Sequence, residues 1–253
     1  PNPRDLKSLV AAFRNSGCTG FAGLNTLFVA LCNDADFRAV DFSRLKLTMS
    51  GGMALTMAAA GRWKEVTGVE IVEGYGMSET SPVISVNPVN ANRLGTIGIA
   101  VPSTEVRIVD DNGNEVAAGE PGELVVRGPQ VMLGYWNQPG ETAKALSPDG
   151  WLHTGDVAVV TPEGYLKIVD RKKDMVVVSG FNVYPNEIEE VVVAHPDVLE
   201  CAAVGIPDER TGEALRVFVV PRHAGLTPEA LREFCRENLT GYKMPREFVI
   251  RAE

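Results

Sequence analysis

The sequence predicts an α/β part of a large domain, then an antiparallel, barrel-like β part of that domain, and finally a small α+β domain. Three observations support this prediction. Strand-like apolar runs alternate with amphipathic stretches over residues 1–94. Short β-branched runs broken by turn residues fill residues 95–170. A strand, helix, strand, strand, helix order follows over 171–253.

In the first part, the apolar runs at 45–49 and 69–72 are short, and longer stretches with helical periodicity separate them. Strands that alternate with helices are typical of βαβ units, whose strands lie parallel in one sheet. We therefore expect a parallel sheet here. Open α/β sheets bind ligands beyond the carboxyl ends of their strands, so the loops after these strands are candidate site segments.

In the second part, EVRIVDDNGNEV at 105–116 contains Asn112 and Gly113 between two β-branched runs. Asn-Gly is a preferred dipeptide of two-residue hairpin turns, because both positions need a positive φ. The segments GELVVRG at 122–128 and GYLKIVD at 164–170 continue the same pattern. We expect an antiparallel sheet or a small barrel.

In the third part, MVVVSG at 175–180 predicts a strand, and Pro185 in a first turn predicts the start of a helix. Strand-like runs follow at 199–204 and 214–220, and Thr227 is a candidate N-cap of a second helix. The order is that of a small α+β domain.

The charged run DRKKD at 170–174 is the best candidate boundary between the large and small domains. Most such runs are solvated turns between strands, so its neighbours have to support a hinge.

The composition excludes some classes of function. The chain has 253 residues, 45% of them hydrophobic, and a formal net charge of −9, which argues against a nucleic-acid or anionic-membrane surface. Its four cysteines lie far apart without CxxC spacing, and its three histidines are isolated. We expect reduced thiols in a cytoplasmic setting and no structural zinc.

The strongest local motif is GYGMSET at 74–80, which follows the strand-like VEIVE. Its glycines allow close approach of the backbone to a ligand, and its tyrosine offers a flat face for a base. Ser78 offers a hydroxyl, and Glu79 offers a hard oxygen ligand for Mg²⁺. The alternative is an ordinary glycine-containing turn with a surface glutamate.

Two weaker motifs accompany it. SGG at 50–52 ends a strand before a helix, a geometry that attracts phosphate, although no GxxxxGK[ST] loop occurs in the chain. WLHTGD at 151–156 places Asp156 after a tight turn, where a carboxylate can accept both hydroxyls of a ribose; the alternative is an Asx cap. Arg171 can reach the same sugar or a phosphate, or it is a surface arginine.

Together with GELVVRGPQVMLGYW at 122–136 and DRKKDMVVVSGFNVYPNEIE at 170–189, these motifs match in order and spacing a known superfamily. The sequence resembles the adenylate-forming enzymes: acyl-CoA synthetases, adenylation domains and luciferases. VSGFNVYPNEIE at 178–189 and LTGYKMP at 239–245 look most like bacterial long-chain fatty-acid–CoA ligases.

The resemblance implies ATP-dependent activation of a fatty acid through an acyl-adenylate, followed by thioester formation with coenzyme A, with Mg²⁺ as cofactor. It implies catalytic roles for Glu79, which would bind Mg²⁺, and for Ser78, which would donate to the phosphate; many relatives carry Thr at the serine position. Lys173 matches the residue about which the small domain of these enzymes rotates, so the resemblance implies that residues 171–253 hold a hinge and a small mobile domain. Gly180 would face the pantetheine tunnel of coenzyme A. The ATP or AMP positions that it implies are Gly51, Gly52, Met53, Gly74, Tyr75, Gly76, Met77, Ser78, Asp156 and Arg171.

Two segments of the superfamily have no counterpart here: the Ser/Thr/Gly-rich phosphate loop and the C-terminal lysine segment. We expect truncation to explain both, and we expect the isolated chain to be inactive in adenylation. The alternatives are an aryl or shorter-chain acyl-CoA ligase, a non-catalytic fragment that binds AMP or an acyl-adenylate, and a luciferase-like oxygenase. We expect the parent protein in the cytoplasm or peripherally at the inner membrane, without a spanning helix.

Overall fold

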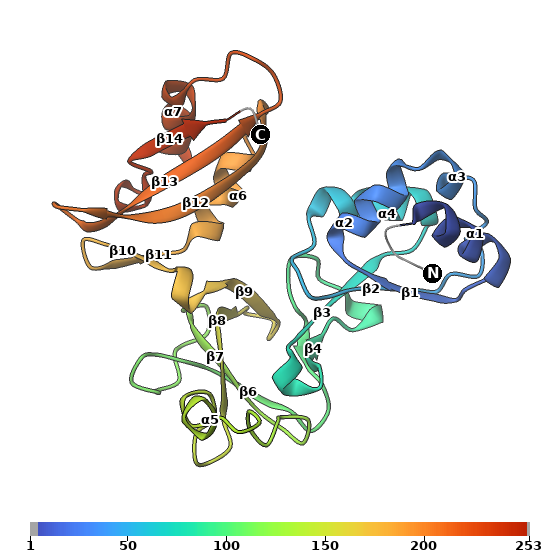
Figure 1. The fold of residues 1–253 in the computed structure, drawn as a ribbon, viewed down its shortest axis with the longest axis horizontal. Coiled ribbons are helices and arrows are strands. Elements are labelled where there is room, and N and C mark those ends of the chain that lie inside the picture. The colour runs from blue at the N-terminus through green and yellow to red at the C-terminus, as the bar shows by residue number, and fades with distance from the viewer. Residues whose placement is uncertain (1–4, 252–253) are drawn as a thin grey trace. The chain divides into compact units, whose positions relative to one another are not determined.

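The computed structural model describes residues 5–251, which divide into two compact units (Figure 1). The N-terminal unit consists of the residues through Thr154 together with Val159–Ile168. The C-terminal unit consists of Gly155–Ala158 together with the residues from Val169 onward. The predicted domain limits at residues 94 and 170 stay a prediction of functional organisation.

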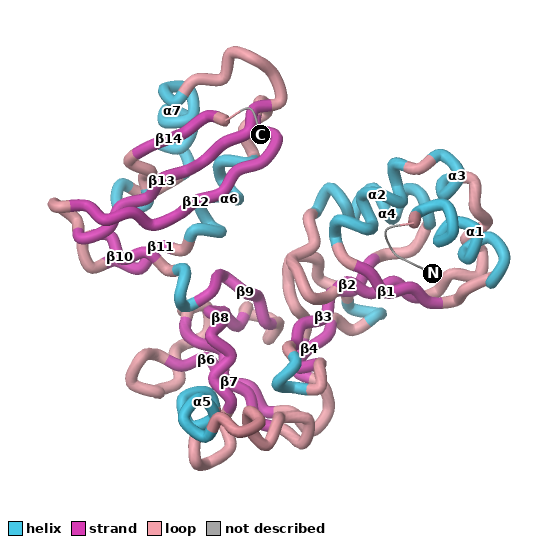
Figure 2. The backbone as a smooth tube through the Cα atoms, in the orientation of Figure 1, coloured by secondary structure: helices cyan, strands magenta, loops and turns pink. Residues whose placement is uncertain are grey.

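The first sheet of the N-terminal unit has the order β1-β2-β3-β4-β5. Its first three strands pair in parallel, as predicted, whereas the last two pair antiparallel. Figure 2 draws the strands in magenta and the helices in cyan. Its strands are β1 Gly20–Gly23, β2 Leu47–Ser50, β3 Ile71–Gly76, β4 Val83–Val86 and β5 Ile99–Ala100. The helices of this region are α1 Leu6–Ser16, α2 Asn25–Asn33, α3 Ala35–Arg38 and α4 Met57–Thr67, and two 3-10 helices are η1 Ser78–Thr80 and η2 Val89–Ala91.

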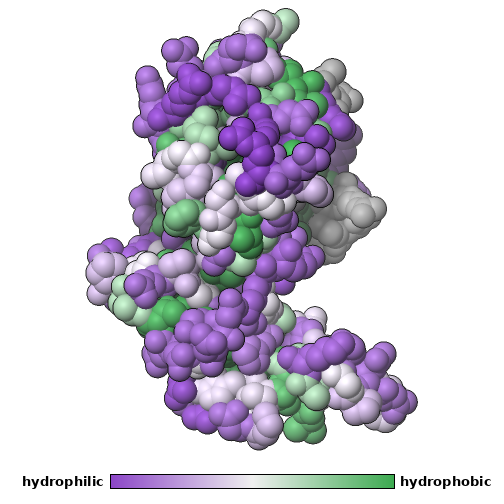
Figure 3. All heavy atoms as spheres, turned by 90° about the vertical axis from the view of Figure 1, so that its left-hand side faces the viewer, coloured by the Kyte–Doolittle hydropathy of each residue, from purple (hydrophilic) through white to green (hydrophobic). Residues whose placement is uncertain are grey.

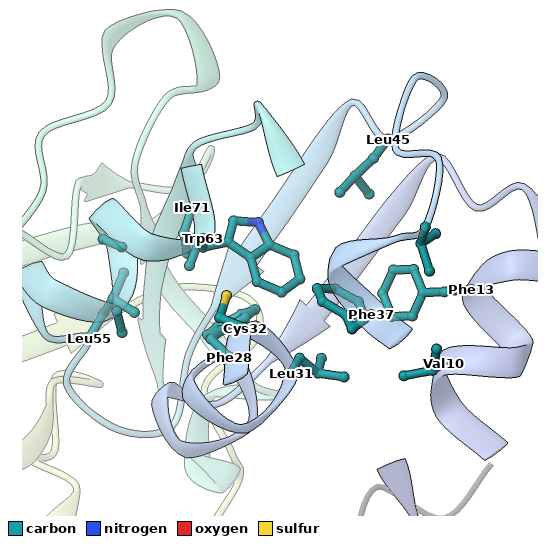
Figure 4. Packing of buried hydrophobic residues seen from close by; sticks show 13 residues of the cluster. Val10, Phe13, Phe28, Leu31, Cys32, Phe37, Leu45, Leu55, Trp63 and Ile71 are labelled. Carbon is teal, nitrogen blue, oxygen red and sulfur yellow. The ribbon is translucent and has the colours of Figure 1, made fainter. Parts of the chain in front are cut away.

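An aromatic core joins these helices to the sheet (Figure 4). Trp63 of α4 is fully buried, its ring stacks on Phe21 of β1, and its Nε1 donates to Thr48 Oγ1 of β2 at 3.1 Å. Helix α4 begins where Thr56 Oγ1 accepts from the backbone N–H of Ala59, and it ends at Gly68, whose φ is +76°. The core therefore fixes α4 against the strand that leads into the SGG segment.

The second sheet is open, so the predicted barrel is wrong. Its order is β6-β7-β8-β9, and none of the sheets formed by the described residues closes on itself. The strand β9 meets the N-terminal half of the chain instead: Leu166 exchanges two backbone hydrogen bonds of 2.8 Å with Ile97 and Gly98. The elements are β6 Glu105–Val109, β7 Gly122–Arg127, α5 Pro139–Ala145, β8 Leu152–Val160 and β9 Leu166–Arg171. The chain turns at Asn112 and Gly113 as predicted, but only Gly113 has a positive φ, +80°, so this is not the predicted turn with two positive φ values.

The C-terminal unit has the predicted order of strands and helices, with a hairpin and a last strand that the sequence pattern missed. Its sheet has the order β11-β10-β13-β12, and β14 pairs in parallel with β13. The strands are β10 Val176–Val178, β11 Phe181–Val183, β12 Val198–Asp208, β13 Gly212–Pro221 and β14 Glu247–Ile250. The helices are α6 Pro185–Val193 and α7 Pro228–Asn238, and the 3-10 helices are η3 Lys172–Asp174 and η4 Gly241–Lys243.

Both predicted helix starts of this unit are confirmed. Pro185 is the first residue of α6, and Thr227 Oγ1 accepts from the backbone N–H of Ala230 at 3.2 Å to cap α7. The buried face of α6 includes Ile188 and Val192.

Figure 3 shows a largely hydrophilic surface on the face that it draws, with hydrophobic side chains only in small groups.

The four cysteines form no disulfide in the described part of the chain. Cys201 and Cys235 both pack in the core of the C-terminal unit. Burial raises the pKa of Cys201 to about 12 and that of Cys235 to about 11. Both thiols are therefore protonated at neutral pH and unreactive.

Candidate functional site

The structure brings the SGG and GYG segments together at the carboxyl ends of two neighbouring strands. Ser50 of β2 lies opposite Glu73 of β3, and a Cβ added to Gly51 would lie 3.3 Å from the backbone oxygen of Gly74. Gly52 then turns the chain with a φ of +80°, which favours glycine. Met53 follows with an exposed side chain. The first two groups of predicted nucleotide residues are thus adjacent, at the sheet edge where α/β sheets bind ligands.

The GYG residues lie inside a strand. Gly74, Tyr75 and Gly76 are the last residues of β3, and they pair antiparallel with β4. A Cβ on Gly76 would overlap the backbone of Pro82, so this position requires glycine. Met77 is half-buried, and its N–H donates to the oxygen of Pro82 at 2.8 Å.

The short helix η1 carries the two predicted catalytic residues. Ser78 is exposed, and Glu79 is half-buried. The hydroxyl of Tyr135 donates to Glu79 Oε1 at 2.8 Å, and the pKa of Tyr135 is raised by this hydrogen bond, by burial and by the charge of Glu79. Sequence reasoning did not select Tyr135, although the residue lies in the matched segment at 122–136. Only the fold reveals this contact, because 56 positions separate the two residues.

Glu79 fits a magnesium ion that a nucleotide carries with it. Across residues 5–251, no three His, Cys, Asp or Glu side chains gather to form a complete protein cage for a metal. Mg²⁺ commonly takes one or two protein carboxylates and completes its octahedron with phosphate oxygens and water. The half-buried carboxylate of Glu79 can supply one such ligand.

The C-terminal unit contains the other two predicted nucleotide residues, Asp156 and Arg171. The prediction that Asp156 follows a tight turn is wrong, because the residue lies in the middle of β8; its neighbour Gly155 nevertheless has a φ of +72°. The Asp156 side chain is 6% exposed, and its Oδ1 lies 2.8 Å from Arg171 Nε. Arg171 is 57% exposed. The structure thus joins these two residues in an ion pair.

The predicted hinge residue, Lys173, is exposed in η3. Just before it, the buried carboxylate of Asp170 accepts from the backbone N–H groups of Arg171 at 2.7 Å and of Asn186 at 2.9 Å. Burial is the main cause that raises the pKa of Asp170, and these two hydrogen bonds oppose it. Asp170 therefore ties the end of β9 to the first turn of α6, a contact that the sequence pattern did not reveal.

Gly180 lies in a hairpin turn between β10 and β11, and not within the strand that the sequence predicted. The φ values of Ser179 and Gly180 are +52° and +85°, the combination of a turn with two left-handed residues. A Cβ on Gly180 would meet no atom within 4 Å. The turn conformation alone thus explains a glycine at this position.

Comparison with known families decides the identity of the fold. The profile of the AMP-binding enzyme family matches residues 1–136, and that of the AMP-binding enzyme C-terminal domain matches residues 187–253. The chain belongs to the AMP-binding enzyme family.

Individual relatives agree with this assignment. The long-chain-fatty-acid–CoA ligase of Escherichia coli O157:H7 is 53% identical over 100% of this chain, which spans 45% of that relative. The feruloyl-CoA synthase of an Amycolatopsis species is 37% identical over 96% of this chain and 50% of its own length. A crystal structure of ATP-bound MatB from Rhodopseudomonas palustris matches with a TM-score of 0.89 and 30% identity, over 98% of this chain and 50% of that one. The chain therefore spans about half the length of these relatives.

None of the helices between residues 5 and 251 is long and apolar enough to cross a membrane.

Proposed function

We propose that the protein containing this chain is an AMP-forming long-chain fatty-acid–CoA ligase. The observation that carries this proposal is the 53% identity to the Escherichia coli ligase along the whole chain. In the first half-reaction, a carboxylate oxygen of the fatty acid attacks the α-phosphorus of ATP, and pyrophosphate leaves. In the second, the sulfur of coenzyme A attacks the acyl carbonyl carbon and loses its proton, the thioester forms, and AMP leaves.

The first half-reaction brings two anions together, so the site has to supply local positive charge and hydrogen-bond donors. Mg²⁺ held by Glu79 would neutralise phosphate charge when it is bound. Ser78 stands next to Glu79 with an exposed hydroxyl that can donate to a phosphate oxygen. These neighbouring side chains at the end of β3 are the proposed catalytic pair.

The adenosine part of the nucleotide requires an apolar face and acceptors for two hydroxyls. We assign the adenine to Tyr75 and the turn at 51–53, because the contact between Gly51 and Gly74 places these segments side by side. We assign the ribose to Asp156, since an ionised carboxylate only accepts hydrogen bonds and the two hydroxyls can both donate. Arg171, whose Nε lies 2.8 Å from Asp156 Oδ1, would assist at the ribose.

The second half-reaction requires the small domain to move and coenzyme A to enter. We propose Lys173 as the hinge, because it is exposed in the short helix η3 that follows β9. Gly180 would line the path of the pantetheine arm, since it is exposed and no atom stands within 4 Å of its missing Cβ. Because the substrate is lipid-like, we place the protein in the cytoplasm or peripherally at the inner membrane, with no nucleic-acid partner.

The deciding experiment uses the full-length protein with palmitate, ATP, Mg²⁺ and coenzyme A. We expect palmitoyl-CoA, AMP and pyrophosphate in equal amounts. The proposal is wrong if saturated acids of about 12 to 18 carbons fail while an aromatic acid is converted, and the likeness to the feruloyl-CoA synthase favours that aryl-CoA ligase as the second candidate.

A separate measurement addresses the isolated chain. We expect calorimetry to detect AMP binding by this chain and no ATP–pyrophosphate exchange. If the full-length protein binds AMP but also fails to exchange pyrophosphate, a non-catalytic nucleotide-binding protein replaces the ligase.

A further inference from the structure

We propose that Tyr135 is a positioning residue that holds the carboxylate of Glu79 in the direction from which it binds the metal of the bound nucleotide. The proposal rests on the proposed function, in which Glu79 is the magnesium ligand. It adds a residue to the site that none of the predicted motifs assigned to it.

Two hydrogen bonds from one segment hold Glu79. The hydroxyl of Tyr135 donates to Glu79 Oε1 at 2.8 Å, and the backbone N–H of Met132 donates to the backbone oxygen of Glu79 at 2.8 Å. The first bond orients the carboxylate, and the second fixes the backbone of η1 from which it projects. Glu79 is therefore oriented by a segment that lies more than 50 residues further along the chain.

Tyr135 is itself braced by α5. Its backbone N–H donates to Thr142 Oγ1 at 2.9 Å, and the same hydroxyl donates to the backbone oxygen of Gln138 at 2.9 Å. The N–H of Gln138 donates back to the oxygen of Tyr135 at 3.2 Å. These bonds fix the backbone of Tyr135, so its phenol is aimed at Glu79 from a supported position.

The chemistry of the phenol suits this role. A tyrosine hydroxyl is a neutral donor, so it restrains the carboxylate and leaves the negative charge of Glu79 available to a cation. A lysine or arginine in its place would orient Glu79 but would also compete with Mg²⁺ for that charge. Carboxylates that ligate metals are commonly hydrogen-bonded in this way, and loss of such a partner typically weakens metal affinity or activity by about 10- to 100-fold.

The control is Tyr165, a second tyrosine of this unit. Tyr165 OH donates to the backbone oxygen of Ala91 at 2.7 Å, and not to Glu79. Tyr135→Phe and Tyr165→Phe therefore remove the same atom, which donates to a carboxylate in the first case and to a backbone oxygen in the second. Tyr135 is 38% exposed, so loss of its hydroxyl creates no buried void.

The test uses the full-length protein and two readouts. Water-proton relaxation measures binding of Mn²⁺–ATP without fatty acid and thus without turnover, and ATP–pyrophosphate exchange gives kcat and the apparent KM for Mg²⁺. We expect Tyr135→Phe to weaken Mn²⁺–ATP binding and to raise the KM for Mg²⁺ by about tenfold, with kcat retained at saturating Mg²⁺. Tyr165→Phe should leave both quantities at the wild-type values.

Two results overturn the positioning role: wild-type metal affinity in Tyr135→Phe, or a loss of kcat at every Mg²⁺ concentration without a change in metal affinity. Glu79→Gln separates this outcome from failure of the proposed function. If Glu79→Gln weakens Mn²⁺–ATP binding and Tyr135→Phe does not, the ligase proposal stands and the positioning role fails. If the wild-type protein shows no Mg²⁺-dependent exchange, the proposed function itself fails.

Discussion

Arg171 Nε lies 2.8 Å from Asp156 Oδ1, and this ion pair joins the last residue of β9 to a carboxylate in the middle of β8. The two partners differ in exposure, since 6% of the Asp156 side chain is accessible and 57% of the Arg171 side chain. The pair thus combines a carboxylate that packing holds in place with a guanidinium at the surface. This arrangement leaves the guanidinium accessible from solvent.

The first prediction concerns Asp156→Asn. We expect this variant to bind AMP about 10- to 100-fold more weakly, because a hydrogen bond to a charged acceptor contributes about 1.5–3 kcal/mol. Calorimetry on the isolated chain measures the change. The control is Asp149→Asn, which replaces a carboxylate that accepts from Ser147 Oγ at 2.6 Å and should leave AMP binding unchanged. Equal affinity of both variants would refute the ribose assignment.

The second prediction separates backbone strain from coenzyme A binding at Gly180. Gly180→Ala and Gly164→Ala both place a side chain at a positive φ, +85° and +84°, with no atom within 4 Å of the new Cβ. Each should lower the free energy of unfolding by about 1 kcal/mol. Only Gly180→Ala should slow thioester formation from preformed acyl-adenylate, which rapid-mixing kinetics on the full-length protein measures. If the two variants slow this step equally, the pantetheine assignment is wrong.

The third prediction compares two tryptophans. Trp63 is fully buried and donates to Thr48, whereas Trp136 is 89% exposed. Trp63→Ala should lower the free energy of unfolding by about 3–5 kcal/mol, because it leaves a cavity and a buried hydroxyl without its donor. Trp136→Ala should change it by less than about 0.5 kcal/mol. Urea denaturation of the isolated chain measures both, and similar losses would contradict the core that Figure 4 shows.

The fourth prediction concerns pH. Burial raises the pKa of Glu73 above its usual value of 4.5, although the N–H of Gly95 donates to its Oε2 at 2.9 Å. Between the unfolded and folded pKa values the folded state keeps a proton that the unfolded state has lost, so stability falls as pH rises. We expect the unfolding free energy of the wild type, relative to Glu73→Gln, to decrease as pH rises above the usual pKa of 4.5.

The control for this prediction has the opposite sign. Hydrogen bonds from Arg127 are the main cause that lowers the pKa of Glu105. The stability that this carboxylate contributes is present above its unfolded pKa and is lost as pH falls through the folded pKa. The wild type should therefore gain stability relative to Glu105→Gln as pH rises. Denaturant titrations at several pH values test both signs. If the stability difference between wild type and variant changes with pH in the same direction for both variants, burial does not raise the pKa of Glu73.

Local signals predicted the elements that local chemistry determines. Pro185 and Thr227 begin their helices in the structure because a fixed φ and a side-chain cap act within one turn. The predicted barrel was wrong because closure depends on pairing between strands that are distant in the sequence. Leu166 of β9 pairs with Ile97 and Gly98 and does not close the sheet. Gly155 explains the error at Asp156. A glycine before an aspartate suggests a turn, and Gly155 does have a positive φ, yet β8 continues through it.

Some residues of the candidate site are visible in the sequence, and others are visible only in the fold. The motif at 74–80 was visible because glycine, hydroxyl and carboxylate residues lie close together in the sequence. The roles of Tyr135 and Asp170 were not visible, since each forms a hydrogen bond with a partner distant in the sequence. Tyr135 bonds to Glu79, and Asp170 bonds to Asn186. A tyrosine or an aspartate in isolation gives no indication of such a partner, so only the fold can reveal it.

The hydrogen bond between Asp170 and Asn186 has a mechanical consequence. The two residues lie on opposite sides of Lys173 in the sequence, and the bond between them is 2.9 Å long. The proposed rotation about Lys173 would carry Asn186 away and leave Asp170 behind, so it has to begin by uncapping α6. If Lys173 is the hinge, the linker would have a preferred resting position, and release of the small domain would cost the hydrogen bonds that Asn186 makes with Asp170 and with the backbone oxygen of Val169.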